Sequence, residues 1–182
     1  MTTQAEPAPD TDLDLSIQVE EESWRDALPD LEPLARRWVA AAAVGAHADR
    51  GGGAARLDSR NGYEMGLVFA SDAAIRALNR DWRGADHPTN VLAFDNADPP
   101  PAGAPWQLGD VVLAFATTRN EARAAGLPLT DHAAHLVIHG VLHLFGYDHQ
   151  DEAEARRMER LEARILGALG IADPYVAAGD GA

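Results

Sequence analysis

The sequence predicts a single layered α/β domain of the α+β-like kind, in which a mixed four-stranded sheet carries about five helices on its faces. Segments with the apolar pattern of strands are interspersed with segments whose apolar residues recur every three or four positions, as on one face of a helix. The 182 residues suffice for one domain with a hydrophobic core, and they contain no internal repeat. The domain is expected at residues 12–171, between a disordered acidic tail at 1–11 and a C-terminal tail at 172–182.

The first predicted elements are a strand and a long helix. Residues 13–19 alternate between apolar and polar, which is typical of a half-buried strand. From Asp30 to about Ala46 the apolar residues have helical spacing. The stretch from Asp49 to Ala55 contains three successive glycines, and because no Lys-Ser or Lys-Thr pair follows them, a flexible connection is favoured over a phosphate-binding loop.

The middle of the chain is predicted to supply the other three strands. A strand is expected from Tyr63 to Ala70, and Ser71 is placed to cap a helix that ends near Trp82. The next expected elements are a corner at 88–90, a strand at 91–94, a loop at 96–106, a buried strand at 110–116 and a helix at 118–125.

Two helices are predicted to complete the domain. The run 131–145 is apolar, with Thr130 as its N-cap and Gly146 as the glycine that ends it. A second helix begins at Asp151 and carries an apolar stripe formed by Met158, Leu161, Ile165 and Leu169.

The helix 131–145 and the turn after it carry a candidate metal site. His139 and His143 are four residues apart, so on a helix they differ by about 40° in direction and about 6 Å in height, and both can reach one cation. Gly146 permits a left-handed turn that brings His149 towards the same point. Three imidazoles suit zinc and leave its fourth position open for water, which is more typical of catalytic than of structural sites.

Two histidines at this spacing also occur by chance on half-exposed helices, and the third histidine, the glycine and the apolar surroundings favour the metal site. His132 and His135 lie earlier on the same helix and are expected to be surface or packing residues, because four histidines on one helix span too much height for one ion. The spacing is also that of the metzincin proteases, but Gly140 stands where their catalytic glutamate must be, which argues against peptide hydrolysis.

The same residues resemble a known family. Residues 139–149 are similar to the HGxLHLxGYDH signature of the YbeY family, 78–94 resemble its LNxxYRxKDxPTDVLSFP segment, and 108–112 resemble its LGDI block. The chain departs from these patterns at four positions, with Trp82 for Tyr or Phe, Ala85 for Lys, Ala93 for Ser and Asp95 for Pro. The absent lysine removes one possible phosphate contact.

The resemblance implies a single-strand-specific, zinc-dependent endoribonuclease that acts in 16S rRNA 3′-end maturation and ribosome quality control. It implies one zinc ion per chain held by His139, His143 and His149, and a cytoplasmic location. The implied partners are single-stranded rRNA, the small ribosomal subunit and its assembly factors, with no DNA and no membrane.

Arg83 is the expected second catalytic group beside the three histidines, because a guanidinium can grip two phosphate oxygens; by resemblance it matches the family's functional arginine. The alternative is that Arg83 caps the preceding helix. Asp148 is a candidate acceptor for an imidazole N–H, and Thr89 and Asn90 are candidates for either substrate binding or a structural role.

Charge and composition narrow the function further. The formal net charge is −14, so tight non-specific RNA binding is not expected, although a bound dication makes its own site positive. The absence of cysteine excludes disulfides and thiolate metal sites, and neither a signal peptide nor an apolar run of membrane length is found. Two alternatives stay open: a ribosome-assembly or RNA-binding factor with a mainly structural metal, and a metallohydrolase of another bond.

Overall fold

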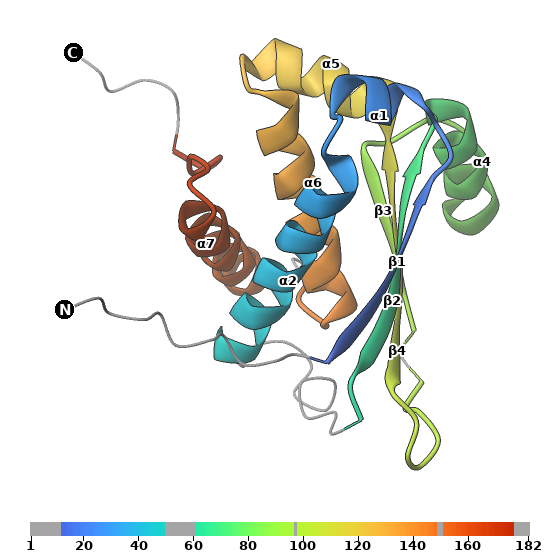
Figure 1. The fold of residues 1–182 in the computed structure, drawn as a ribbon, viewed down its shortest axis with the longest axis vertical. Coiled ribbons are helices and arrows are strands. Elements are labelled where there is room, and N and C mark those ends of the chain that lie inside the picture. The colour runs from blue at the N-terminus through green and yellow to red at the C-terminus, as the bar shows by residue number, and fades with distance from the viewer. Residues whose placement is uncertain (1–11, 50–60, 97, 149–150, 177–182) are drawn as a thin grey trace.

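The computed structural model describes residues 12–49, 61–96, 98–148 and 151–176, and these form one sheet with helices packed around it (Figure 1). The strands are β1 (Leu13–Val19), β2 (Tyr63–Ala70), β3 (Val91–Asp95) and β4 (Trp106–Ala114). The helices are α1 (Ser23–Ala27), α2 (Leu31–Asp49), α4 (Asp72–Arg83), α5 (Phe115–Ala125), α6 (Leu129–Leu144) and α7 (Glu152–Ala168). The predicted acidic tail and the glycine-rich connection at 50–55 lie outside the described residues.

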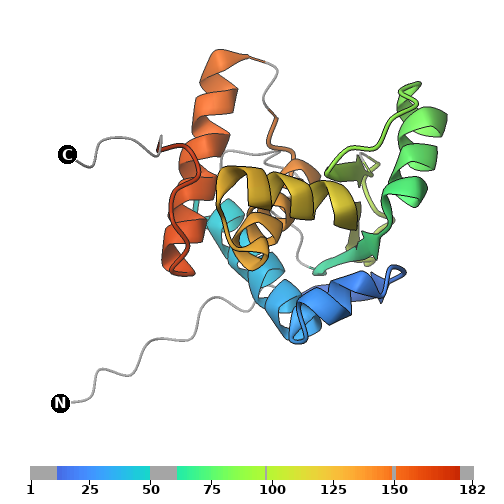
Figure 2. The same cartoon turned by 90° about the horizontal axis from the view of Figure 1, so that it is seen from above.

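The sheet is mixed and four-stranded, as predicted, and its strands lie in the order β1-β2-β4-β3. β1, β2 and β4 run parallel, and β3 pairs antiparallel with β4 at one edge. Helices α2 and α6 cover one face of the sheet, while α4 lies on the other (Figure 1). Seen from above, α4 and α7 lie at opposite ends of the molecule with α6 between them (Figure 2).

The core lies between the sheet and α6. The central residues Val137, Ile138, Val141 and Leu142 of α6 are fully buried. Gly140 faces Val111 of β4 so closely that a Cβ added to it would lie 2.6 Å from a Val111 methyl carbon. The missing side chain therefore allows the helix that carries the histidines to approach the sheet closely.

The structure corrects several predicted boundaries. β4 begins at Trp106 and not at Asp110. The strand continues across Gly109, whose φ of +118 and missing side chain let its backbone lie against that of Phe94. The strand ends at Ala114 and α5 starts at Phe115, three residues before the predicted helix. Pro128, and not Thr130, is the N-cap of α6, since its carbonyl accepts the first bonds from the amides of Asp131 and His132.

The structure also contains a short helix that the sequence pattern did not predict. In α1, Trp24 is fully buried, packs edge-on against Phe69 and Phe115, and donates its indole N–H to the carbonyl of Ala70. The stability of α1 therefore depends on contacts with distant parts of the chain. None of the helices in the described part of the chain has both the length and the apolar character needed to cross a bilayer.

Candidate metal centre

His139 and His143 project from the same side of α6. Their Nε2 atoms lie 3.0 Å apart, and their rings are nearly perpendicular, with centroids 4.6 Å apart. Two nitrogens that bind one tetrahedral zinc ion at roughly 2.0 to 2.1 Å stand roughly 3.3 Å from each other. The observed separation is close to that value, so the two imidazoles fit a shared zinc ion.

Both histidines line a cavity of about 490 Å³. Its wall combines the described residues of α6 and the following turn with the edge strand β3 and the end of α4. The lining residues are Arg83, Val91, Ala93, Asp95, His139, Gly140, His143, Gly146, Tyr147 and Asp148. The fold thus brings Arg83, Asp148 and two of the predicted ligands to one cavity, although Arg83 is 56 positions before His139.

The predicted third ligand, His149, lies outside the described residues. Within the described ranges up to 148 and from 151 onwards, no group of three His, Cys, Asp or Glu side chains is arranged to hold a metal, and these ranges contain two of the three predicted ligands. Gly146 adopts the expected left-handed conformation with φ +87, and the backbone N–H groups of Gly146 and Tyr147 bond to the carbonyls of His143 and Leu142. This turn ends α6 at the cavity wall.

Arg83 contacts the cavity wall from the last position of α4. Its Nη2 donates to the carbonyl of Ala93 on β3 at 3.4 Å, which is long for such a bond. The carbonyls of Asn79 and Arg80 near the end of α4 accept the backbone N–H groups of Ala85 and Gly84, the latter in its left-handed conformation. The Arg83 side chain thus reaches β3 from a position where its charge also lies at the C-terminal end of α4, so the phosphate-binding role and the helix-capping role both stay predictions.

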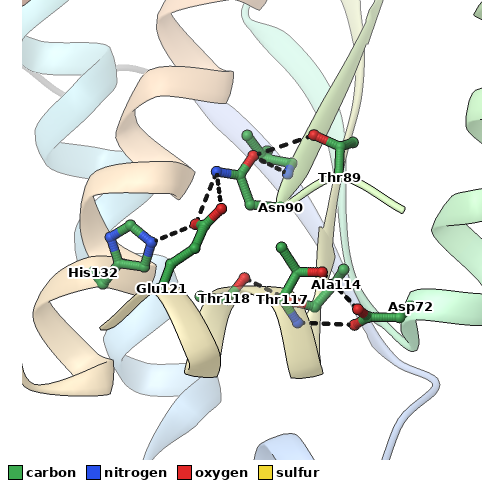
Figure 3. Close-up of polar contacts among 9 residues, drawn as sticks. Asp72, Thr89, Asn90, Ala114, Thr117, Thr118, Glu121 and His132 are labelled. Carbon is green, nitrogen blue, oxygen red and sulfur yellow. Dashed lines mark hydrogen bonds and ion pairs between the residues drawn. The ribbon is translucent and has the colours of Figure 1, made fainter. Parts of the chain in front are cut away.

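Thr89 and Asn90 belong to a separate polar network and are not among the described residues that line the cavity. The Asn90 amide donates to both carboxylate oxygens of Glu121, and Glu121 lies 2.8 Å from Nε2 of His132 (Figure 3). Oδ1 of Asn90 accepts the backbone N–H of Val91 and a long hydrogen bond from the hydroxyl of Thr89. Asn90 therefore ties the start of β3 to α5 and α6, which is a structural role.

Sequence reasoning missed one residue of the centre, Glu162 of α7. Its side chain is fully buried, and its Oε1 lies 2.7 Å from Nδ1 of His139. Its Oε2 lies 3.1 Å from Nε2 of His135 and accepts a hydrogen bond from the hydroxyl of Tyr175. Asp148, predicted as an acceptor for an imidazole N–H, lies in the wall of the same cavity as His139 and His143.

The electrostatics of Glu162 follow from these contacts. Burial alone raises the pKa of its carboxyl group, but the hydrogen bonds with His135, His139 and Tyr175 and the charge of His139 outweigh burial and lower the pKa to about 2. The residue could have been found in the sequence, because it occupies a position of the apolar stripe of α7 between Leu161 and Ile165. An acidic residue inside an apolar stripe needs a polar partner.

Gly140 also limits the chemistry of the centre. A glutamate at this position would have to force its Cβ against the stiff, branched side chain of Val111. The protease arrangement, with a catalytic glutamate after the first histidine, is therefore excluded by packing as well as by residue type.

Comparison with known proteins confirms the resemblance seen in the sequence. The family model described as Endoribonuclease YbeY matches residues 52–170. A Paramagnetospirillum magneticum protein described as Endoribonuclease YbeY is 47% identical over 168 residues, which cover 90% of this chain and 96% of that protein. A protein of the same description from Alkalilimnicola ehrlichii is 47% identical over 177 residues, covering 96% of this chain and 97% of that protein.

Among solved structures, the solution structure of a Thermotoga maritima protein is similar with a TM-score of 0.49 and 20% identity, over 88% of this chain and 98% of that chain. The family model and the curated relatives both extend across the histidine-bearing segment and the Arg83 segment. The chain therefore belongs to the Endoribonuclease YbeY family.

Proposed function

We propose that this chain is a zinc-dependent endoribonuclease that cleaves single-stranded ribosomal RNA in the cytoplasm, in 16S rRNA 3′-end maturation and ribosome quality control. The observation that supports it most is the shared cavity, where a guanidinium from α4 and two imidazoles from α6 face one space. Metal-assisted cleavage of a phosphodiester uses a metal ion beside a group that binds the phosphate, and these side chains can supply both.

The metal is held by His139 and His143, with His149 as the third ligand. Zinc bound there supplies a Lewis acid and activates water near neutral pH. The chain's own groups supply the rest. Asp95 and Asp148 are the described carboxylates in the cavity wall, and so they are the side chains placed to accept a proton from water.

Arg83 binds the phosphate. Its long bond to the Ala93 carbonyl is readily exchanged for two charge-assisted bonds to phosphate oxygens. A guanidinium in this place stabilises the negative charge that gathers on those oxygens in the transition state.

The surroundings of Arg83 favour a single strand as substrate. Trp82, the preceding residue, is 74% exposed and leans edge-on against Phe94, with a ring centroid distance of 6.0 Å. Exposed aromatic rings beside a phosphate-binding group are typical platforms for unpaired bases. The bases of a duplex are stacked on each other and cannot use such a platform.

The test compares Arg83→Ala with Arg80→Ala, which removes an exposed arginine from the same helix. We expect Arg83→Ala to slow cleavage of single-stranded RNA by about 100-fold or more while the zinc content stays at that of the wild type. Arg80→Ala should cleave normally, and His143→Ala should lose zinc by elemental analysis. Normal cleavage by Arg83→Ala would overturn the assignment.

A second function, that of a ribosome-assembly factor, is favoured by the net charge of −14 and by Ala85 in place of a lysine. A ribosome-assembly factor with a mainly structural metal would tolerate weak RNA binding. In that case the purified wild type would show no cleavage of RNA, and Arg83→Ala would support the assembly of small subunits as well as the wild type does.

A further inference from the structure

Glu162 is a charged group in a place where charge is costly. It is fully buried among the apolar residues of α7, and a buried carboxylate without partners strongly destabilises a folded protein. Such a residue is tolerated when each of its oxygens is bonded. The partners of Glu162 therefore indicate why it is there.

The partner of Oε1 is the Nδ1 of His139, at 2.7 Å. A neutral imidazole carries its proton on one nitrogen and has a lone pair on the other. Since a carboxylate only accepts hydrogen bonds, the contact requires the proton of His139 to be on Nδ1. The lone pair is then on Nε2, which faces Nε2 of His143 and the cavity.

The partners of Oε2 come from two other elements. His135 lies one turn before His139 on α6, and its Nε2 is 3.1 Å from Oε2. The Tyr175 hydroxyl donates to the same oxygen and lies 3.2 Å from Nε2 of His135, while the tyrosine ring stays 43% exposed. Tyr175 is beyond the residues 52–170 that match the family model, in the segment that follows α7.

We propose that Glu162 is a positioning residue of the metal centre, that it fixes the tautomer and direction of His139, and that Tyr175 and His135 complete its hydrogen bonds. The segment after α7 is then part of the centre, and His135 acts through the carboxylate and not as a ligand. This inference rests on the proposed role of His139 in binding zinc. Partners of this kind raise the affinity of a metal site by about 10- to 100-fold.

The first test measures zinc affinity of the full chain by competition with a chromophoric chelator. Glu162→Gln is expected to bind zinc 10- to 100-fold more weakly than the wild type, and Tyr175→Phe several-fold more weakly. Glu159→Gln, which changes an exposed glutamate on the same helix, should bind as the wild type does. Wild-type affinity in Glu162→Gln would overturn the proposal.

The second test needs neither zinc nor a variant that folds poorly. Side-chain ¹⁵N NMR of the metal-free wild type reports which nitrogen of His139 carries the proton. The proposal expects Nδ1–H, and an Nε2–H tautomer would overturn it. If the wild type fails to bind zinc, the proposed function fails, while this measurement still decides whether Glu162 orients His139.

Discussion

Gly140 shows at the scale of one residue how packing and chemistry are linked in this chain. It lies between the two histidines, faces the cavity, and stands against Val111 on the sheet side. Any side chain there would push α6 away from β4 and carry His139 and His143 with it. Gly140 thus determines how close His139 and His143 lie to the sheet, and it leaves no carboxylate at the position between them.

This close approach predicts opposite effects for two helical glycines. Gly140→Ala should lower the free energy of unfolding by about 1 to 3 kcal/mol, because its Cβ must displace Val111. Gly167→Ala on α7, where a Cβ meets nothing within 4 Å, should raise it by about 0.5 to 1 kcal/mol through helix propensity. Urea denaturation measures both, and equal effects would contradict the packing argument.

Trp82 carries a prediction about substrate. Trp82→Ala should weaken the binding of single-stranded RNA by about 1 to 3 kcal/mol, the usual contribution of one base stacked on an aromatic ring. Binding is measured by fluorescence anisotropy of a labelled oligonucleotide. Leu127→Ala, which removes another exposed apolar side chain from the corner before α6, is the control and should leave binding unchanged. A Trp82→Ala protein with wild-type affinity would remove the stacking platform from the proposal.

At the scale of elements, the parts that follow local pattern could be predicted and the parts that depend on distant contacts could not. Strands β1 and β2 have the predicted limits because alternation and bounding polar residues are local signals. Helix α1 exists because Trp24 fills a space between β2 and α5, which no local pattern reveals. The site follows the same division. The spacing of His139 and His143 is a local pattern on one helix, so it could be predicted from the sequence.

The contact of Glu162 with His139 depends on how α7 packs against α6. Arg83 was identified by resemblance, and its place in the cavity depends on α4 ending beside the edge strand β3. The sequence thus indicated the candidate groups, and the fold determines which of them meet.

Asp49 joins three elements and predicts a pH dependence. It is at the end of α2 and bonds Arg157 and Arg164 of α7 and the hydroxyl of Tyr147 in the turn after α6. Burial raises the pKa of its carboxyl group, but these hydrogen bonds and the charge of Arg157 outweigh burial, so its pKa lies below the ordinary 3.8. A lowered pKa means that the stabilisation is present above this ordinary value and is lost as the pH falls through the folded-state pKa.

Asp49→Asn should therefore be less stable than the wild type by about 1 to 3 kcal/mol at pH 7, and the difference should shrink as the pH falls below about 4. Denaturation curves of both proteins across this pH range test the expectation. Asp26→Asn, at an exposed position of α1, is the control and should be nearly neutral. A difference that stays constant with pH would show that the Asp49 charge contributes nothing.

At the scale of the whole molecule, the distribution of charge determines how RNA can approach. The face of the sheet that points away from α2 and α6 carries Asp14, Glu64 and Asp110, which repel phosphate. The cavity between β3, α6 and the end of α4 has one arginine among its described lining residues, Arg83. With a net charge of −14, long-range attraction for RNA is absent, so recognition has to come from short-range contacts at the cavity.

This arrangement predicts a weak salt dependence of RNA binding. A single strand gives a slope of about −0.7 in log K against log salt for each phosphate that is neutralised, so one arginine gives a slope near −0.7. Anisotropy with chelator-treated protein, which leaves the RNA intact, measures the slope without the charge of a metal. Arg83→Ala should bring the slope close to zero, whereas Arg80→Ala should leave it unchanged. A slope of several units in the wild type would instead indicate that RNA is held by arginines outside the cavity, and the approach of the substrate would have to be assigned to another surface.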